Sequence, residues 1–242
     1  MIGLGTIANT AAVLAGGIAG LLFGKKMKQN IQDGLMKASG VAVIFIGMAG
    51  TLQYMMVVSD GKIETQGTML LIFSLCIGCI LGEICKIEKR MEDLGEILKK
   101  KVNRKNDNLF VDGFVNTSLI ICIGAMAIVG SMQDGLTGDP SMLFVKSVID
   151  GVIVMVNASI FGVGAIFSAV PIALYPGTIT LFSAGFGNIV NDTLIQELSY
   201  VGSVLIFCVG INVTFGKKIK VGNMLPALLV PIGYEVIRGM MG

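Results

Sequence analysis

Long apolar runs recur along this chain, and they constrain its fold more than any other feature. The hydrocarbon core of a bilayer is about 30 Å thick, so a helix needs about 20 apolar residues to cross it. With 54% hydrophobic and 14% charged residues, the chain is too apolar for a soluble protein of its size. We therefore predict an all-α polytopic membrane protein whose main partner is the lipid bilayer. Six clear runs cover residues 2–23, 38–58, 68–85, 114–132, 198–215 and 223–241.

The mostly apolar stretch between residues 141 and 191 is longer than one crossing. It contains glycines, Pro171 and the turn signal Tyr175-Pro176-Gly177. We predict a division at that turn, into a helix over 142–175 that is kinked near the glycines or Pro171, and a short segment over 177–190. The total is then about eight transmembrane segments, one of them short or broken. An alternative is that residues 177–190 re-enter the membrane without crossing it.

Basic residues are concentrated in three connections. Fifteen of the eighteen Lys and Arg lie in residues 24–37, 86–109 and 216–222. Because cytoplasmic loops carry an excess of Lys and Arg, these connections are predicted on the cytoplasmic side, with both termini outside. The acidic loops that hold Asp60, Glu64, Asp134 and Asp139 are predicted on the outer side. An even number of crossings must then separate Lys105 from Lys217, and the predicted division gives four. A net charge of +2 indicates no nucleic-acid partner.

Apolar residues follow helical spacing in the basic connection, which we delimit as residues 86–112. The pattern predicts an amphipathic helix on the cytoplasmic surface. This helix either docks on anionic lipid through its lysines or serves as a solvated linker.

Two parts of the chain resemble each other. Residues 61–70 match residues 216–225 without a gap at five of ten positions, and Gly78 corresponds to Gly233. Residues 40–47 resemble 202–210 more loosely, and 5–7 resemble 177–179. Residues 1–85 and 176–242 are therefore predicted as two repeat units of three helices, flanking central helices in 113–175. An offset of five crossings makes the repeat inverted, as in many secondary transporters; chance similarity between apolar segments is the alternative.

Small residues recur every four positions in two of the runs, at Gly16, Gly20 and Gly24 and again at Ser74, Gly78 and Gly82. Such stripes let helices pack closely. The partner is either another helix of the same chain or a second copy, so a homodimer is one alternative.

Histidine is absent, which excludes imidazole-based triads and histidine-ligated metals. The five cysteines are interpreted as small packing residues, the Cys76-x-x-Cys79 pair included. An intramembrane enzyme would need a pair of aspartates, and Glu83 and Glu235 both lie near the ends of their runs. We therefore expect no enzymatic activity, no metal and no cofactor.

Polar residues inside the runs form the candidate binding site. Lys146 and Asp150 stand four residues apart on one helical face, and Asn157 lies two turns further along it. A charge at this depth is costly unless it is paired or hydrated, so Asp150 is a candidate ion or proton site tuned by Lys146. The alternative is an interfacial ion pair that orients the helix. Further amides and hydroxyls that could line a site are Asn9, Asn116, Thr178 and Asn188.

Several motifs together resemble one bacterial family. They are Gly5-Thr-Ile-x-Asn9, Gly113-Phe-x-x-Thr-Ser118, Gly124-Ala-Met-Ala-Ile-x-Gly-Ser-x-Gln-Asp-Gly135, Lys146-Ser-x-x-Asp150-Gly151, Phe167-Ser-Ala169 and Gly222-Asn-x-Leu-Pro-Ala227. The chain is similar over nearly its whole length to domain of unknown function 554, the YdfK/YqgA-like proteins. The resemblance implies a bacterial inner-membrane protein, often labelled a transporter, without an established substrate.

The polar residues favour a secondary transporter or facilitator of a small polar solute or cation, with its site near mid-membrane between the inverted repeats. The alternative is a membrane scaffold or sensor subunit that transports nothing and recruits a cytoplasmic partner through the amphipathic connection. Flux measurements and the capture of a loop-dependent partner would distinguish the two.

Overall fold

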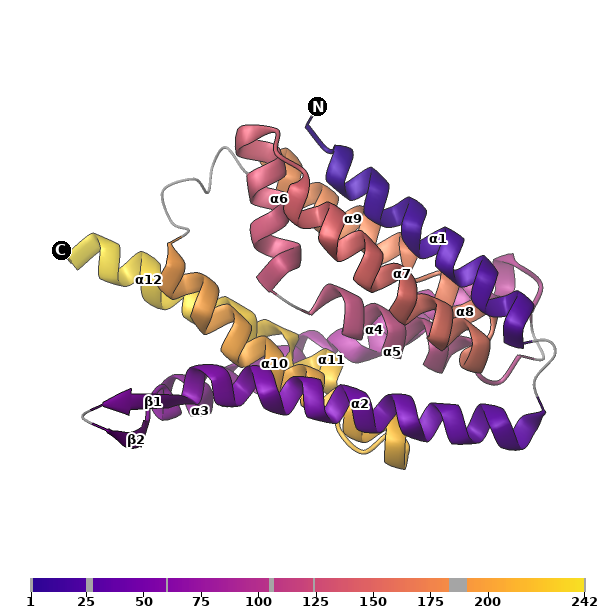
Figure 1. Ribbon diagram of the computed structural model, residues 1–242, viewed down its shortest axis with the longest axis horizontal. Coiled ribbons are helices and arrows are strands. Elements are labelled where there is room, and N and C mark those ends of the chain that lie inside the picture. Colours follow the sequence, from indigo (N-terminus) through magenta and orange to yellow (C-terminus); the bar gives the residue numbers. More distant parts are fainter. Residues whose placement is uncertain are drawn as a thin grey trace. The chain divides into compact units, whose positions relative to one another are not determined.

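The computed structural model describes residues 2–24, 28–59, 61–104, 107–123, 125–182 and 191–241, and this part of the chain is helical except for one hairpin. Figure 1 shows the elements in chain order. They are α1 (Leu4–Gly24), α2 (Gln29–Met55), β1 (Met56–Ser59), β2 (Lys62–Thr65), α3 (Thr68–Cys85), α4 (Ile87–Lys101), α5 (Phe110–Cys122), α6 (Ala125–Thr137), α7 (Ser141–Phe161), α8 (Val163–Ile166), α9 (Ala169–Phe182), α10 (Asp192–Phe215), α11 (Val221–Met224), the 3-10 helix η2 (Leu225–Leu228) and α12 (Leu229–Met241).

The described part of the chain contains six helical stretches that are long and apolar enough to cross a membrane: α1, α2, α3, α7, α8 with α9, and α10. A seventh crossing is formed if α5 and α6, whose axes differ by 78°, make one bent span. These stretches confirm an all-α, multi-pass membrane protein. The eighth segment predicted from the sequence coincides with α11, η2 and α12, which together form a divided segment.

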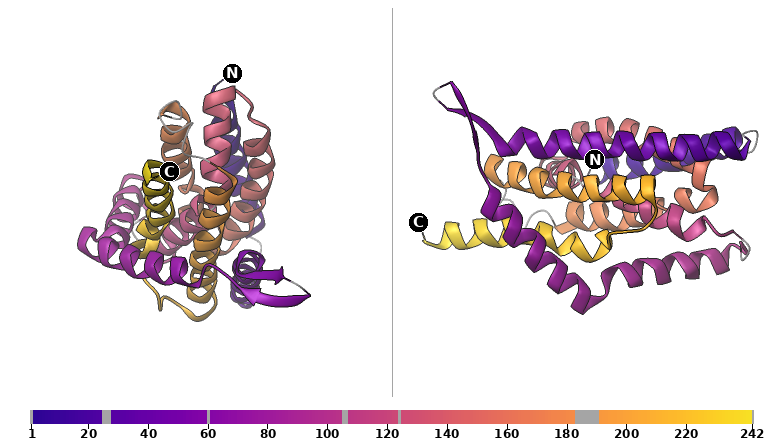
Figure 2. Two further views of the ribbon diagram at one scale, coloured as in Figure 1. Left: turned by 90° about the vertical axis from the view of Figure 1, so that its left-hand side faces the viewer. Right: turned by 90° about the horizontal axis from the view of Figure 1, so that it is seen from below.

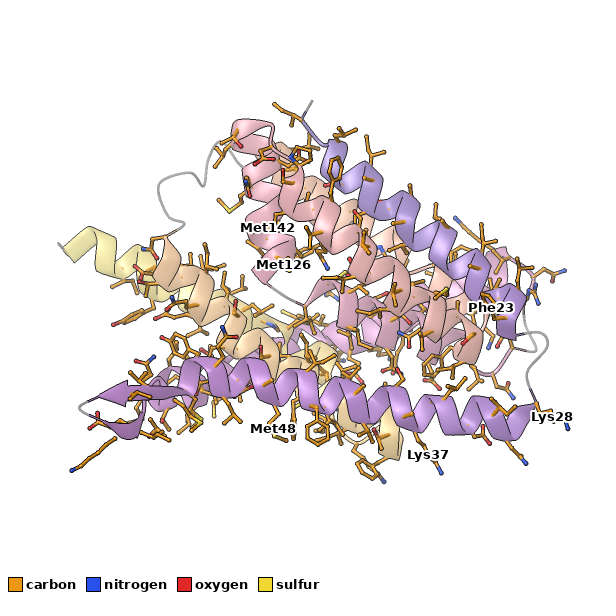
Figure 3. The ribbon with its side chains drawn as sticks, in the orientation of Figure 1. Phe23, Lys28, Lys37, Met48, Met126 and Met142 are labelled. Carbon is orange, nitrogen blue, oxygen red and sulfur yellow. The ribbon has the colours of Figure 1, made fainter. Side chains whose placement is uncertain are left out.

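Apolar side chains on the outer faces fit this membrane location. Figure 3 labels Phe23, Met48 and Met126, whose side chains are exposed. Exposed apolar residues line the outer faces of α1, α2, α3 and α7. Lipid chains cover such surfaces at no cost, whereas water would not.

The break between α7 and α9 differs from the predicted one. The prediction of a turn at Tyr175-Pro176-Gly177 is wrong, because α9 continues through Pro176. The chain bends at Gly162, which confirms the kink predicted near the glycines; its φ of 75° and ψ of −147° are costly for any residue with a side chain. Pro171 lies in the first turn of α9, where a missing N–H group costs no helical hydrogen bond. Residues 141–182 therefore form two membrane-length stretches, and residues 183–190 of the predicted short segment lie outside the described residues.

The chain divides into two compact units. The first comprises residues 1–39, 89–122 and 126–187. In this unit α1 packs along α7 in the same direction, because a side chain at Gly16 would overlap the Gly151 carbonyl and one at Gly20 would overlap the Met155 carbonyl. The glycine stripe of α1 is thus a packing surface within the chain. An apolar core follows beside it, made by Val13, Ile121, Val154, Ala169 and Ile172.

The second unit comprises residues 40–88, 123–125 and 188–242. The strands β1 and β2 form an antiparallel ribbon with Met56 opposite Thr65, and Figure 2 shows the ribbon extending beyond the end of α2. The small-residue stripe of α3 packs on α11 and η2, because a side chain at Gly78 would overlap Ala227 and one at Gly82 would overlap Asn223. This second stripe is also a packing surface within the chain.

The helices α2 and α10 cross in the second unit through two glycines. A side chain at Gly47 would overlap the backbone nitrogen of Phe207, and one at Gly210 would come within 2.6 Å of the backbone nitrogen of Ile44. Each glycine therefore faces the residue three positions before the other glycine. Contacts that are reciprocal in this way are those of two antiparallel helices related by a local two-fold axis.

Candidate functional site

A buried ion pair lies on α7 in the first unit. The Nζ atom of Lys146 lies 2.8 Å from both carboxylate oxygens of Asp150. The two residues are only 7% and 2% exposed. Spacing of four residues places both side chains on one face of the helix, as the sequence predicts.

Lys146 also satisfies the end of a neighbouring helix. Its Nζ atom donates to the Ile121 carbonyl at 2.8 Å, in the last turn of α5. The last four carbonyls of a helix have no partner within the helix, and they form the negative end of its dipole. The ammonium group therefore neutralises the Asp150 carboxylate and stabilises the end of α5 at the point where α5 and α6 diverge.

Asn9 connects α1 to this ion pair. Its Nδ2 atom donates to Asp150 Oδ2 at 2.9 Å, and the side chain is fully buried. The close approach of α1 to α7 along the glycine stripe brings a short amide side chain within reach of the carboxylate. Three of the residues predicted for the site, Lys146, Asp150 and Asn9, thus form one cluster.

Several buried polar atoms on the helices that form this cluster have no hydrogen-bond partner within the described part of the chain. Among them are Asn9 Oδ1, Asn157 Nδ2 and Thr117 Oγ1, on α1, α7 and α5. A buried polar group without a partner costs about 1–3 kcal/mol. These atoms would accept or donate hydrogen bonds if a polar ligand or water reached them.

The other predicted site residues lie elsewhere. Asn116 on α5 is half-buried and Thr178 on α9 is exposed, with the Thr178 hydroxyl donating to the Tyr175 carbonyl of its own helix. Thr180, two residues further on, instead lies 3.4 Å from Thr6 of α1, hydroxyl to hydroxyl. Asn188 falls outside the described residues.

Sequence reasoning missed the burial of a carboxylate on α6. We expected Asp134 in an acidic outer loop, but α6 continues to Thr137 and carries Asp134 into the interior, where it is fully buried. Its Oδ2 atom accepts a hydrogen bond of 3.1 Å from the Gly5 amide at the start of α1. The available signal was the motif from Gly124 to Gly135, which places Ser131 and Asp134 on one helical face.

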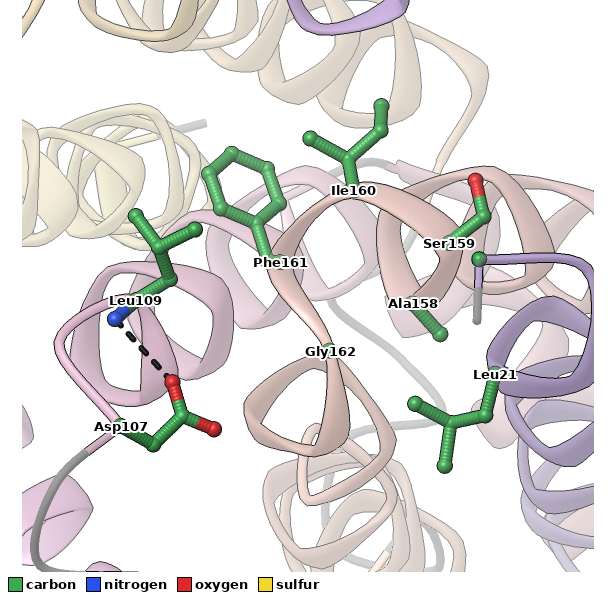
Figure 4. Close-up of a pocket in the computed structure, with 9 residues that line it drawn as sticks. Leu21, Asp107, Leu109, Ala158, Ser159, Ile160, Phe161 and Gly162 are labelled. Carbon is green, nitrogen blue, oxygen red and sulfur yellow. Dashed lines mark hydrogen bonds between the residues drawn. The ribbon is translucent and has the colours of Figure 1, made fainter. Parts of the chain in front are cut away.

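The end of α7 holds a separate pocket, shown in Figure 4. Its volume is about 260 Å³ and its lining is mainly apolar, with Asp107 and Ser159 as polar members. The Asp107 carboxylate is engaged by the Leu109 amide at 3.2 Å. None of the lining residues belongs to the cluster around Asp150, so this pocket is a separate feature.

A second polar cluster joins the start of α4 to the start of α11 in the second unit. Glu88 is 5% exposed. Its carboxylate accepts from the Gly222 amide at 3.0 Å and lies 2.7 Å from Lys217 Nζ, while its own amide donates to Asn223 Oδ1 at 2.8 Å. These contacts fix the beginning of the predicted amphipathic helix.

Comparison with known proteins places the chain in a family. The profile of the family described as "Protein of unknown function (DUF554)" matches residues 4–235. The chain belongs to the DUF554 family. This DUF554 protein is 35% identical over 227 residues to the Bacillus subtilis protein named "Uncharacterized membrane protein YdfK", with 94% of this chain and 93% of that protein covered.

A more distant relative of this DUF554 protein is the Escherichia coli "Uncharacterized protein YqgA", 26% identical over 234 residues, with 94% of each chain covered. No solved structure matches the chain. The resemblance expected from the sequence motifs is therefore confirmed, together with the membrane location.

Proposed function

We propose that this DUF554 protein is a secondary transporter or facilitator of a small polar solute or cation. The observation that carries the proposal is the set of buried polar atoms without partners in the described residues on α1, α5 and α7, the helices that contribute to the cluster of Asn9, Lys146 and Asp150. Hydrocarbon penalises such atoms, and polar residues inside membrane segments commonly mark the path of a solute. Asp150 with Lys146 forms the charged part of the proposed site, and Asn9 and Asn157 form its amide lining.

An aspartate enzyme would use two carboxylates that share a proton. Asp134 supplies a second buried carboxylate, but Asp150 is engaged on both oxygens by Lys146. When one ammonium group contacts both oxygens of a carboxylate, neither oxygen is free to share a proton with a second carboxylate. This engagement favours binding and transport over catalysis.

The contacts between α2 and α10 support an inverted repeat. The similar residues 40–47 and 202–210 lie on these two helices, which cross antiparallel through Gly47 and Gly210 with reciprocal contacts. If both helices cross the bilayer, their local two-fold axis lies in the membrane plane, as in transporters built from inverted repeats. We propose that the repeat units of residues 1–85 and 176–242 follow this axis, with eight segments and both termini outside the cell. In that arrangement α9 and α10 run opposite to α1 and α2.

The two divided regions fit this architecture. The helices α5 and α6 diverge by 78°, and the last predicted segment is divided among α11, η2 and α12. Broken helices expose unpaired backbone groups, and transporters use such helix ends for their ligand sites. The Ile121 carbonyl, which Lys146 contacts, lies at one of these ends.

The variant Asn157→Leu tests the proposal with little risk to folding. Because Asn157 Nδ2 has no partner within the described residues, leucine removes a buried amide without breaking a hydrogen bond that involves this atom. We expect a folded protein that no longer gains thermal stability from the solute that stabilises the wild type, since bound ligand stabilises the folded state. The probes are single amino acids, polyols and choline chloride at constant sodium, screened by circular dichroism melting in detergent.

The matched control is Glu64→Gln, which removes an exposed carboxylate from β2 and should keep the wild-type response. A solute identified in this way is then tested for flux in proteoliposomes. An unchanged response in Asn157→Leu would remove this residue from the site. Absence of flux together with a cytoplasmic partner that depends on residues 86–112 would replace the proposal by the scaffold or sensor function.

A further inference from the structure

Asp134 is a buried carboxylate that the proposed solute site does not use. One of its oxygens, Oδ2, accepts from the Gly5 amide. The other, Oδ1, has no hydrogen-bond partner within the described residues, although Asp134 is 0% exposed. A carboxylate with one free oxygen in an apolar interior is unstable unless a positive group compensates it.

The charges near Asp134 do not balance. The helix α1 has no titratable side chain, and α6 carries Asp134 alone. The helix α7 supplies one positive and one negative group, Lys146 and Asp150, and these neutralise each other at 2.8 Å. Within the described residues, Asp134 makes no ion pair with a Lys or Arg.

The start of α1 compensates the charge of Asp134 only in part. The amide of Gly5 belongs to the first turn, where the helix dipole is equivalent to about half a positive charge. The remaining negative charge on the carboxylate matches a single monovalent cation. Nothing in the described part of the chain groups three His, Cys, Asp or Glu side chains, which is the arrangement that divalent metals usually require.

A second oxygen lies on the same face of α6. Ser131 stands three residues before Asp134, is fully buried and donates its hydroxyl to the Ala127 carbonyl. The donated hydroxyl keeps lone pairs free to accept or to coordinate. Oxygen atoms of carboxylates and hydroxyls are the ligands that hard cations prefer.

We propose that Asp134 binds a monovalent cation, a proton or Na⁺, through its free oxygen Oδ1, with Ser131 as the neighbouring oxygen. The inference rests on the proposed transport function and names its coupling site. It assigns the exchangeable positive charge to Asp134 rather than to Asp150, because Lys146 already neutralises Asp150.

The geometry also indicates how cation binding is transmitted to the solute site. Gly5 contacts Asp134 and Asn9 contacts Asp150, so the two carboxylates engage consecutive turns of α1, about 5 Å apart along its axis. A cation that changes the interaction between Asp134 and the start of α1 acts on the helix that carries Asn9. Cation and solute would then favour the same position of α1, which is the thermodynamic requirement for coupling.

The test measures cation-dependent stability in purified protein, without a transported solute. Thermal unfolding is followed while sodium chloride replaces choline chloride at constant ionic strength and pH, and then across a pH series at constant sodium. The variant is Asp134→Asn, which keeps an oxygen that can accept from the Gly5 amide and removes the charge. The control for the sodium series is Asp139→Asn, which removes a nearby carboxylate in the connection to α7, and the control for the pH series is Glu64→Gln on β2.

We expect wild type and Asp139→Asn to gain stability from the cation, and Asp134→Asn to bind it about 100-fold more weakly or not at all, since even indirect support of a metal ligand accounts for about 10–100-fold in affinity. A response to sodium at fixed pH assigns Na⁺. A response to pH that Asp134→Asn lacks assigns the proton. Equal cation responses in wild type and Asp134→Asn, or no cation response in the wild type, would overturn the inference.

If Asp134→Asn does not fold, Ser131→Ala decides the matter. A cation affinity reduced about tenfold supports the site, whereas an unchanged affinity overturns it. The outcome is separate from that of the proposed function. Cation binding without solute flux in proteoliposomes would support the Asp134 site and overturn the transport proposal. Solute flux that depends on neither sodium nor pH would support transport and overturn the Asp134 site.

Discussion

The ion pair between Lys146 and Asp150 makes a prediction with a large and specific effect. In the variant Lys146→Met, Asp150 keeps the Asn9 amide as its donor and loses the ammonium group that contacts both its oxygens at 2.8 Å. Removing one partner of a buried pair leaves an uncompensated charge and costs about 3–5 kcal/mol. Asp150→Leu should cost a similar amount, because Lys146 then retains the Ile121 carbonyl as its contact.

The double variant Lys146→Met/Asp150→Leu should cost much less than the two single variants together. No charge remains buried there, and the residual cost is that of the Ile121 carbonyl and the Asn9 amide, which lose their partners at about 1–3 kcal/mol each. The double variant then costs about 2–6 kcal/mol, against about 6–10 kcal/mol for the two single variants combined, so we expect a favourable coupling energy of about 4 kcal/mol in the double-mutant cycle.

Unfolding free energies can be measured by circular dichroism in detergent micelles, since the chain contains no tryptophan for fluorescence. The control is Lys220→Met, which removes an exposed pair with Glu83 at 2.9 Å and should change stability by less than about 1 kcal/mol. If the two single variants behave like this control, or if their effects simply add in the double variant, Lys146 and Asp150 are not a desolvated pair and the proposed site loses its charged part.

Three further changes test other parts of the structure. Gly16→Ala should destabilise the protein by about 1–3 kcal/mol in the same melting assay, because the new methyl group overlaps the α7 backbone. The control Gly233→Ala should be neutral or stabilising, because its methyl group meets no atom within 4 Å. Glu88→Ala should accelerate trypsin cleavage within α4, because the contacts that fix the start of this helix are lost; an unchanged cleavage rate would contradict this role. The hydrogen bond from the Ser141 hydroxyl lowers the pKa of Asp139. The Asp139 carboxylate therefore stabilises the fold at pH values above its unfolded pKa of about 4, and this stabilisation is lost as the pH falls through the lower folded pKa. The variant Asp139→Asn should destabilise the protein at neutral pH and match the wild type in acid.

The membrane-length helices were the most predictable part of the fold. The run over residues 68–85 coincides with α3, because bilayer thickness fixes how long an apolar helix must be. The break positions were less predictable. Gly162 and the pair Pro176-Gly177 are both turn signals, and the choice depends on packing: a side chain at Gly164, just after the bend, would overlap the Phe110 carbonyl of α5.

In the candidate site, contacts between residues of one helix were predictable from the sequence, and contacts between distant parts of the chain were not. The spacing of Lys146 and Asp150 within one helix predicted their pairing, whereas the contact of Asp150 with Asn9 joins residues 141 positions apart. Asp134 was missed because its charge suggested a loop. A polar residue near the end of a helix takes its burial from neighbouring helices, and the sequence of α6 alone carries no information about them.

The arrangement of charges follows from the divergence of α5 and α6. The divergence leaves the last carbonyls of α5 without helical partners, and the Ile121 carbonyl requires a donor in an apolar interior. The ammonium group of Lys146 is that donor. A buried ammonium group requires a counter-ion, which is the Asp150 carboxylate, and the Asn9 amide donates a further hydrogen bond to this carboxylate. Each of these groups is accounted for by the stability of the fold. The stability of the fold does not account for the free oxygen of Asp134 or for the free amide hydrogens of Asn157. An unpaired polar atom that the fold does not need is where a transported ligand can bind without disturbing the structure.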